Sequence, residues 1–292
     1  MTADGVVYAA NLWEDAVERV EQSAALDPIA DSLHGCMSRL LRNGRVKDVL
    51  SGTWLGHAAH PMFTDLPIGF WTSAFVLDLV GGRQSRGAAE LLVGFGVLSA
   101  LPTAATGASD WSDTEGASRR VGLVHAMANA SATVLYAWSW NARRRDRYVQ
   151  GVALGMLGAT AATVGGLLGG HLLARLGTGV DHTAFLRAPT EWTPTLAEAG
   201  VSDVPVRVEV GGVPVLLVRH HGRVVALSAI CPHRGAPLDE GTVEAETITC
   251  PWHRSRFALD GGRLMRGPAA EPLACYESRV VDGTVEVRSR RS

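Results

Sequence analysis

Charged residues are scarce in this chain of 292 residues, at 19% of the total, whereas a typical soluble domain contains about 25%. Neither sign dominates, because 27 Lys and Arg stand against 29 Asp and Glu, for a formal net charge of -2. The missing basic excess argues against a nucleic-acid-binding protein, which usually carries a basic patch or stripe. The chain also has only four cysteines, too few for a disulfide-stapled scaffold, which favours their use in redox or metal chemistry.

Four long segments contain almost no charge, and they predict a helical membrane domain. Three of them lack Asp, Glu, Lys and Arg altogether, while the first carries Asp65 and Asp78. The segments are 61–80, 91–109, 121–142 and 148–174. Each is close to the ~20 mostly apolar residues that a helix needs to cross a bilayer core about 30 Å thick. A buried pair of helical hairpins in a soluble core is the alternative, but four such segments in succession favour membrane insertion.

The first 55 residues differ from this pattern and predict a soluble helical lead-in. The N-terminal segment is acidic and lacks an apolar run of signal-peptide length, so we expect no cleavable signal. Apolar residues such as Leu33, Met37 and Leu40 then recur at helical spacing. The predicted organisation is therefore a lead-in at 1–55 followed by a four-helix membrane domain at 56–187.

The last hundred residues or so predict a small antiparallel β domain at 188–292. Short β-branched runs such as VPVLLV at 213–218 alternate here with turn residues. Gly211-Gly212 and Asp282-Gly283 separate alternating apolar residues, which is a strong signal for β-hairpins. The expected fold class is a two-domain protein, with an all-α, four-span transmembrane helical bundle followed by an all-β domain.

Two short motifs in this β domain combine cysteine with histidine. They are Cys231-Pro-His233 and Cys250-Pro-Trp-His253. Two thiolates and two imidazoles can hold a tetrahedral zinc ion. In zinc fingers, however, the cysteine pair precedes the histidine pair, whereas here each motif contains one residue of each type.

The residues around these motifs resemble the cluster-binding loops of the Rieske [2Fe–2S] family. The three loops are CPHRGAPL at 231–238, CPWHRSRF at 250–257 and the proline-containing RGPA at 266–269. The resemblance covers about residues 190–292 and implies a [2Fe–2S] cluster as the cofactor. It further implies that Cys231 and Cys250 hold one iron. The second iron would be held by His233 and His253.

Departures from the high-potential branch of that family predict a ferredoxin-type, low-potential cluster. Ala236 and Trp252 occupy the positions where that branch has two further cysteines joined as a disulfide. Ser255 is present, but Phe257 stands where that branch has a tyrosine that hydrogen-bonds a cluster sulfur. Fewer hydrogen bonds to sulfur leave the reduced cluster less stabilised. Arg254 replaces the usual glycine and adds a local positive charge.

The resemblance points to an electron-transfer component of an oxidoreductase system rather than to a terminal oxygenase. In ring-hydroxylating oxygenases the Rieske domain is followed by a large catalytic domain with a 2-His-1-carboxylate iron site. Here only 39 residues follow His253, so we expect no such domain and name no catalytic residue.

The membrane segments contain three histidines that form a candidate second site. GHAAHPMFTDLPIGF (56–70) and GGHLLARLGTGVD (169–181) resemble an uncharacterised four-helix membrane-domain family that is often fused to Rieske domains. Four antiparallel spans would bring His60, His125 and His171 to one membrane face. Two facing histidines could ligate haem axially, and three could bind a second metal. The alternative is that they cap helix ends or hydrogen-bond backbone.

Charged residues near the opposite face predict ion pairing rather than chemistry. Asp78 and Glu90 lie there, and we expect them to pair with Arg83 or Arg86. Six basic residues flank the spans on each face, so the positive-inside rule gives no orientation. The absence of the disulfide cysteines and of an export signal favours a multi-pass cell-membrane protein with a cytoplasmic Rieske domain.

Two function classes follow from this sequence. The first is a membrane-anchored Rieske protein that carries single electrons between a soluble redox partner protein and a membrane partner, either a quinone or a haem. The second is a non-catalytic membrane redox sensor or assembly module whose cluster reports redox state. Membrane lipid is an expected partner in both classes, and nucleic acid in neither.

Overall fold

The computed structural model describes residues 3–41 and 44–289, with side chains from residue 12 onward. The chain divides into two compact units. The helical unit contains the described residues up to 41 together with 59–178, and the β unit contains 44–58 together with 179–289.

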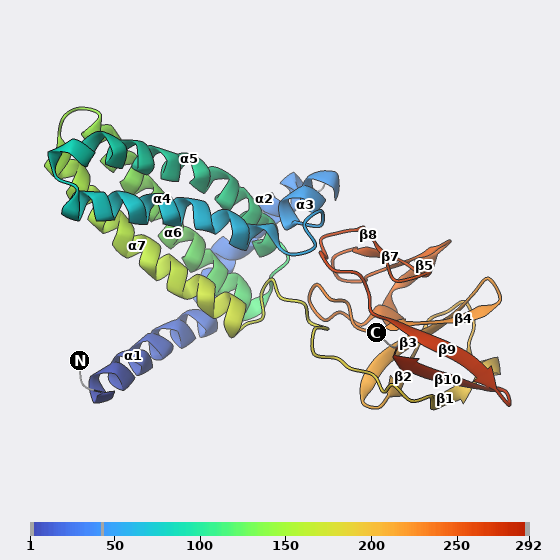
Figure 1. Cartoon of the computed structure of the whole chain (residues 1–292). Coiled ribbons are helices and arrows are strands. Elements are labelled where there is room, and N and C mark those ends of the chain that lie inside the picture. The colour runs from blue at the N-terminus through green and yellow to red at the C-terminus, as the bar shows by residue number, and fades with distance from the viewer. Residues whose placement is uncertain (1–2, 42–43, 290–292) are drawn as a thin grey trace. The chain divides into compact units, whose positions relative to one another are not determined.

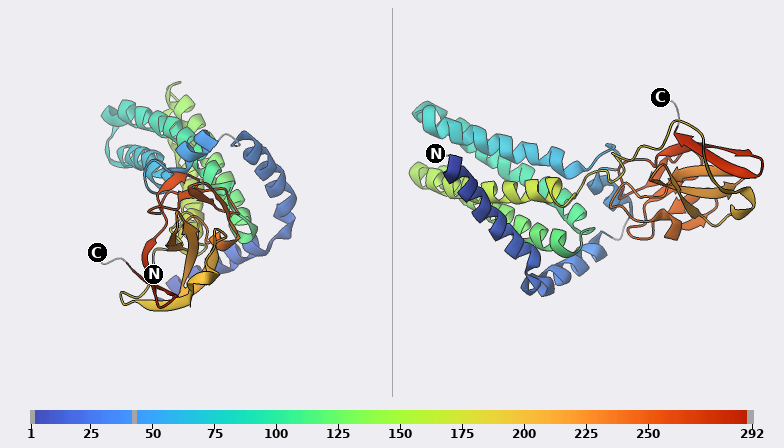
Figure 2. Two further views of the ribbon diagram at one scale, coloured as in Figure 1. Left: turned by 90° about the vertical axis from the view of Figure 1, so that its right-hand side faces the viewer. Right: turned by 90° about the horizontal axis from the view of Figure 1, so that it is seen from below.

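The helical unit consists of two long helical hairpins with two further helices (Figure 1). Its helices are α1 (Ala3–Gln22), η1 (Ala24–Leu26), α2 (Asp27–Leu40), α4 (Ala59–Val80), η2 (Arg83–Ser85), α5 (Arg86–Trp111), α6 (Gly116–Arg143) and α7 (Tyr148–Ala174). Helix α4 packs along α5, and α6 packs along α7, as the further views also show (Figure 2). Between the hairpins the Trp71 and Tyr136 rings stack, with centroids 4.0 Å apart.

Three of the four long helices are apolar enough to cross a membrane, so the four-span prediction is wrong in one element. The candidates by length and composition are Ala59–Val80, Arg83–Trp111 and Tyr148–Ala174. Helix α6 lacks charge over 121–142 but contains uncharged polar residues such as Asn129, Ser131 and Thr133, which lower its hydropathy. The predicted two-domain layout, a helical membrane domain followed by a β domain, is confirmed.

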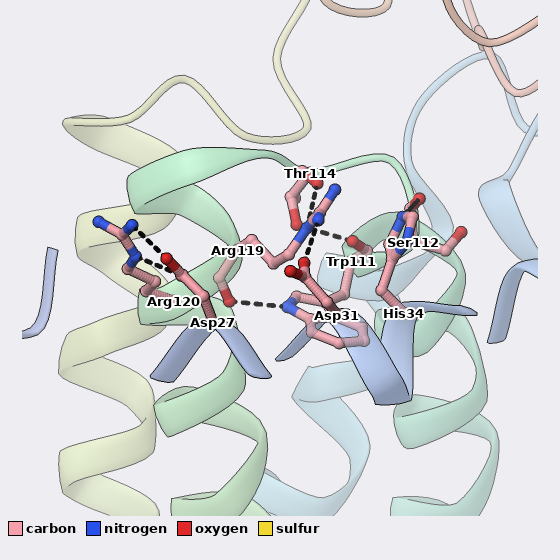
Figure 3. A network of polar contacts seen from close by, with 8 residues as sticks. All are labelled: Asp27, Asp31, His34, Trp111, Ser112, Thr114, Arg119 and Arg120. Carbon is pink, nitrogen blue, oxygen red and sulfur yellow. Dashed lines mark hydrogen bonds and ion pairs between the residues drawn. The ribbon is translucent and has the colours of Figure 1, made fainter. Parts of the chain in front are cut away.

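Helix α2 is attached to the helical unit by a polar network at the loop between α5 and α6 (Figure 3). Arg120 donates two hydrogen bonds to the Asp27 carboxylate, at 2.6 and 2.7 Å. Arg119 donates to Asp31 at 2.8 Å, and His34 donates to the backbone oxygen of Ser112 at 2.8 Å. These contacts hold the first part of the predicted lead-in against the start of α6.

The second part of the predicted lead-in lies in the β unit, so the structure divides residues 1–55 between the two units. Helix α3 (Gly44–Ser51) is followed by Thr53, whose hydroxyl donates to the backbone oxygen of Ala269 at 3.1 Å. A Cβ at Gly267 would lie 2.2 Å from the Thr53 Oγ1 atom. Only glycine therefore allows this approach of residues 44–58 to the third loop of the Rieske-like sequence.

The β unit contains two antiparallel sheets. Six strands form the larger sheet, in the order β1 (Thr193–Ala197), β10 (Thr284–Ser289), β9 (Cys275–Val281), β4 (Arg223–Ser228), β3 (Val213–His220) and β2 (Val206–Val210). The smaller sheet has the order β5 (Thr242–Glu244), β6 (Thr247–Thr249), β7 (Arg256–Ala258) and β8 (Leu264–Arg266). A core that includes Leu216, Leu238 and Phe257 joins the two sheets. The core also contains Cys231 and Cys250, so each motif loop begins at a buried cysteine.

Candidate metal centre

The two motif loops have the same backbone hydrogen-bond pattern. In the first loop, Cys231 N donates to Ala236 O, and Gly235 N donates back to Cys231 O, both at 2.9 Å. In the second, Cys250 N donates to Ser255 O at 2.8 Å, and Arg254 N donates to Cys250 O at 3.2 Å. Each loop therefore closes on its own cysteine and presents the following residues outward. The first loop comes after β4 and the second lies between β6 and β7.

The fourth residue after each cysteine has a left-handed backbone. Gly235 has φ +75° and Arg254 has φ +66°. Glycine adopts this conformation freely, whereas a side chain makes it unfavourable. The arginine that replaces glycine in the second loop thus keeps the glycine-type geometry.

The four predicted ligand residues lie together at these loops. Cys231 and Cys250 are each 1% exposed, and their thiols hydrogen-bond to one another. The imidazole rings of His233 and His253 lie beside each other, with centroids 4.9 Å apart and planes at 89°. All four cysteines of the chain are free thiols. Two buried thiols and two neighbouring imidazoles are the donor set that a Rieske [2Fe–2S] cluster requires, so the residues present fit this cofactor.

The two thiols of the site differ in protonation, and one imidazole is neutral. The pKa of Cys250 falls to about 6, chiefly because Cys231 donates a hydrogen bond to its sulfur, with the backbone N–H groups of Trp252 and His253 adding to the effect. The same contact, together with burial, raises the pKa of Cys231. Burial lowers the pKa of His233 well below its ordinary value, so its ring is neutral at pH 7. Thiolate and neutral imidazole are the forms that ligate metal, so Cys250 and His233 have the ligating form, whereas Cys231 would lose its proton on binding iron.

Ser255 connects the second loop to the third. Its side chain is fully buried, and its Oγ accepts a hydrogen bond from the Ala269 backbone N–H at 2.9 Å. The Ala269 carbonyl in turn accepts from Thr53. Phe257 is also fully buried, so the residue that replaces the family tyrosine packs in the core below the loops.

Sequence reasoning did not identify two basic residues that lie near His233. Lys47 on α3 and His182, which follows α7 in the chain, both act electrostatically to lower the pKa of His233. The His182 backbone N–H donates to Pro232 O at 2.9 Å. Lys47 lies 186 positions before His233 in the numbering, and no motif links them, so only tertiary contacts could reveal this neighbourhood. Trp252, which is 54% exposed, flanks His253 on the surface.

The structure brings together two of the three membrane-domain histidines. The rings of His60 on α4 and His125 on α6 have centroids 6.2 Å apart, with planes at 84°. His171 on α7 pairs instead with Glu21 on α1, with its Nε2 atom 2.6 Å from the carboxylate. A carboxylate that the sequence pattern did not connect to α7 therefore engages the third histidine.

Asp78 pairs with a different arginine from the two expected. Arg143 donates to both its carboxylate oxygens, at 2.9 and 2.6 Å, and the Tyr148 hydroxyl also donates to it. The expected partner Arg86 lies over the Tyr148 ring, 4.4 Å from its centroid. The prediction of an Asp78 pair with Arg83 or Arg86 is wrong, because it compared positions near one loop and ignored the packing of α6 beside α4.

A further cluster of His and Glu side chains lies on the β unit. His220 and His221 at the β3–β4 turn each contact Glu246 in the β5–β6 turn, at 2.8 and 3.0 Å. The hydrogen bond from His220 is the largest influence that lowers the pKa of Glu246. The contact joins the two sheets at their turns. None of these three residues belongs to a motif identified in the sequence, so only the structure reveals the cluster.

Comparison with known proteins identifies both parts of the chain. Residues 191–277 match the family model of the Rieske [2Fe-2S] domain, and residues 56–182 match that of the Predicted membrane protein (DUF2231). The anthranilate 1,2-dioxygenase ferredoxin subunit of Burkholderia cepacia is 34% identical over 98 residues, which is 33% of this chain and 91% of that protein.

Two further matches each cover about a third of this chain. Apoptosis-inducing factor 3 of Mus musculus is 34% identical over 84 residues, 29% of this chain, and this chain spans only 14% of its length. Among solved structures, the ferredoxin of carbazole 1,9a-dioxygenase from Nocardioides aromaticivorans IC177 has 29% identity and a TM-score of 0.33. That match covers 34% of this chain and 98% of the ferredoxin.

Proposed function

Because this chain belongs to the Rieske [2Fe–2S] family and joins that domain to a DUF2231 membrane domain, we propose that it is a membrane-anchored electron carrier. It would pass single electrons between a soluble redox protein and a membrane partner, either a quinone or a haem. The observation that carries this proposal is the pair of matching loops that place two thiols and two imidazoles together.

The cluster, when bound, supplies reversible one-electron oxidation and reduction. We propose Cys231 and Cys250 as the ligands of one iron and His233 and His253 as the ligands of the other. The two cysteines lie in the core, which excludes water from the sulfur side. The two histidines are partly exposed and lie toward the surface, where Trp252 is also exposed. Electrons would therefore enter and leave on the histidine side.

The soluble partner is proposed to be an oxidoreductase that exchanges one electron at a time. The similarity to a dioxygenase ferredoxin subunit supports this class of partner. We further propose that the β unit lies on the cytoplasmic side of the cell membrane, which its free cysteines support. A reporter enzyme or fluorescent protein fused to the C-terminus tests this orientation.

The full chain, purified anaerobically in detergent, tests the cluster assignment. We expect iron and sulfide in equal amounts and a reduced-state EPR signal whose average g value lies below that of an all-cysteine ferredoxin. Stoichiometric zinc without iron or sulfide would refute it. The midpoint potential should lie toward the low end of about −150 to +300 mV, the range of Rieske centres.

Addition of a quinol or of a reduced soluble ferredoxin reductase then tests electron transfer. Catalytic turnover, with the cluster cycling between its two states, is the expected result. A cluster that changes state once, without turnover with any donor and acceptor pair, would instead support the sensor or assembly class.

A further inference from the structure

The helical unit repeats one local arrangement in its two hairpins. In the α4–α5 hairpin, the Nδ1 atom of His60 lies 3.0 Å from the backbone oxygen of Thr103 on α5. In the α6–α7 hairpin, the Nδ1 atom of His125 lies 2.8 Å from the backbone oxygen of Gly165 on α7. Each histidine comes from the first helix of its hairpin and contacts the second helix.

A glycine completes the repeat in each hairpin, four residues beyond the accepting carbonyl. A Cβ at Gly107 would lie 2.7 Å from the Cε1 atom of His60, and a Cβ at Gly169 would lie 3.1 Å from the Cε1 atom of His125. The glycines therefore provide the space for both rings. The same three parts, a histidine, a carbonyl and a glycine, thus recur at matching positions, and the two rings meet between the hairpins.

These contacts determine which ring nitrogen is protonated. A backbone carbonyl only accepts hydrogen bonds, so Nδ1 carries the hydrogen in both histidines and Nε2 carries a lone pair. Thr106 Oγ1 lies 3.4 Å from the Nδ1 atom of His60, but it donates its own hydrogen to backbone oxygens of α5. The Asn129 amide donates to the His125 backbone oxygen at 2.9 Å, and its Nδ2 atom also lies 3.3 Å from His125 Nε2, whose lone pair accepts that contact. A metal at Nε2 would replace this contact with Asn129.

A histidine that donates its Nδ1 hydrogen to a carbonyl is oriented as metal-ligating histidines commonly are. The spacing of the two rings also suits a shared metal. With a metal–nitrogen distance of about 2.0–2.1 Å, the centre of an imidazole lies about 3.2 Å from the ion. The centres of two imidazoles on opposite sides of one ion are then about 6.4 Å apart, close to the 6.2 Å between the His60 and His125 centroids.

We infer that His60 and His125 hold one redox-active metal through their Nε2 atoms, either the iron of a haem or a copper ion. Both metals accept neutral imidazoles and change charge by one electron. His171 is not part of this site, because its Nε2 atom contacts Glu21. The inference does not depend on the cluster in the β unit, and either assignment could fail without the other.

The test uses the full chain in detergent, examined as purified and after incubation with haemin or with a copper salt. Haem ligation predicts a Soret band and the sharp visible bands of a six-coordinate, low-spin iron. Copper predicts one bound ion per chain by metal analysis and a copper EPR signal with nitrogen hyperfine structure. Neither metal bound at one per chain by the wild-type protein would overturn the inference.

Single-residue variants locate the site. His60→Ala and His125→Ala should each abolish the metal signal, while His171→Ala should keep it. Added imidazole should restore the signal to His60→Ala, which an unfolded bundle could not show. A metal signal that survives both alanine variants would also overturn the inference, since the metal would then have other ligands.

Alanine substitutions at two neighbouring glycines test the site without removing either histidine ligand. Gly169→Ala should lower the affinity for the metal about 10-fold, because its Cβ would displace the His125 ring. A Cβ at Gly170, on the same helix, would have no atom within 4 Å. Gly170→Ala should therefore bind the metal like the wild type. Equal effects of the two substitutions would contradict the proposed role of Gly169.

Discussion

The buried ion pair between Asp78 and Arg143 allows a quantitative prediction. The side chains are 7% and 1% exposed, respectively, and Arg143 makes two hydrogen bonds to the carboxylate. Removing one partner of such a pair leaves an uncompensated buried charge, at a cost of about 3–5 kcal/mol. Replacing both partners by apolar residues of similar volume is often neutral or stabilising.

The expected effect on thermal stability follows from this difference. For a unit of this size, 1 kcal/mol corresponds to about 2–4 °C in the unfolding midpoint, so Asp78→Leu should lower it by about 6–20 °C. Arg143→Met should also lower it. The double variant Asp78→Leu/Arg143→Met should recover most of the loss, giving a large positive coupling in the double-mutant cycle.

Tryptophan fluorescence of the full chain in detergent, recorded on heating, measures these midpoints. Glu14→Ala provides the control, because Glu14 and Arg175 form an exposed pair at 3.3 Å in the same unit. Exposed pairs contribute at most about 1 kcal/mol, so this variant should shift the midpoint by no more than about 4 °C. If Asp78→Leu shifted the midpoint no more than Glu14→Ala, the pair would not stabilise the bundle as a buried interaction.

Three further predictions concern the β unit. A side chain at positive φ costs about 1 kcal/mol, and both Gly235 and Arg254 have positive φ. Arg254→Gly should therefore raise the temperature at which the visible absorption of the cluster is lost, and Gly235→Ala should lower it. Shifts of both variants in the same direction would contradict this. Phe257→Tyr should raise the midpoint potential of the cluster in a redox titration, because the tyrosine hydroxyl would add a hydrogen bond near sulfur. An unchanged potential with an intact cluster would argue against this hydrogen bond. The pKa of Glu246 is lowered chiefly by the hydrogen bond from His220, so its contribution to stability is present above about pH 4.3 and is lost as pH falls below that value. Thermal midpoints of wild type and Glu246→Gln should therefore differ near neutral pH and converge in acid, and a constant difference would refute this.

Local sequence patterns are enough to predict the two domains and the cofactor class. Uncharged segments long enough for spans, and then alternating β-branched runs, are properties of the local chain, and the two-domain layout follows from them. The cluster motifs are also local, because each loop closes by hydrogen bonds between a cysteine and residues four and five positions later. The one error in the spans came from counting charge alone, since α6 is uncharged over its middle but polar.

Tertiary structure alone decided which distant side chains meet. The topology put His60, His125 and His171 at one end of the bundle, but the packing of α1 gave Glu21 to His171 and left the other two rings together. The same holds for Asp78, whose partner Arg143 lies at the end of α6 and not in the loop next to Asp78 in the chain. Helical periodicity fixes which residues share a face, yet which face meets which neighbour depends on how whole helices pack. Which helix faces pack together depends on the contacts of the whole fold, and no local pattern in a single sequence predicts it.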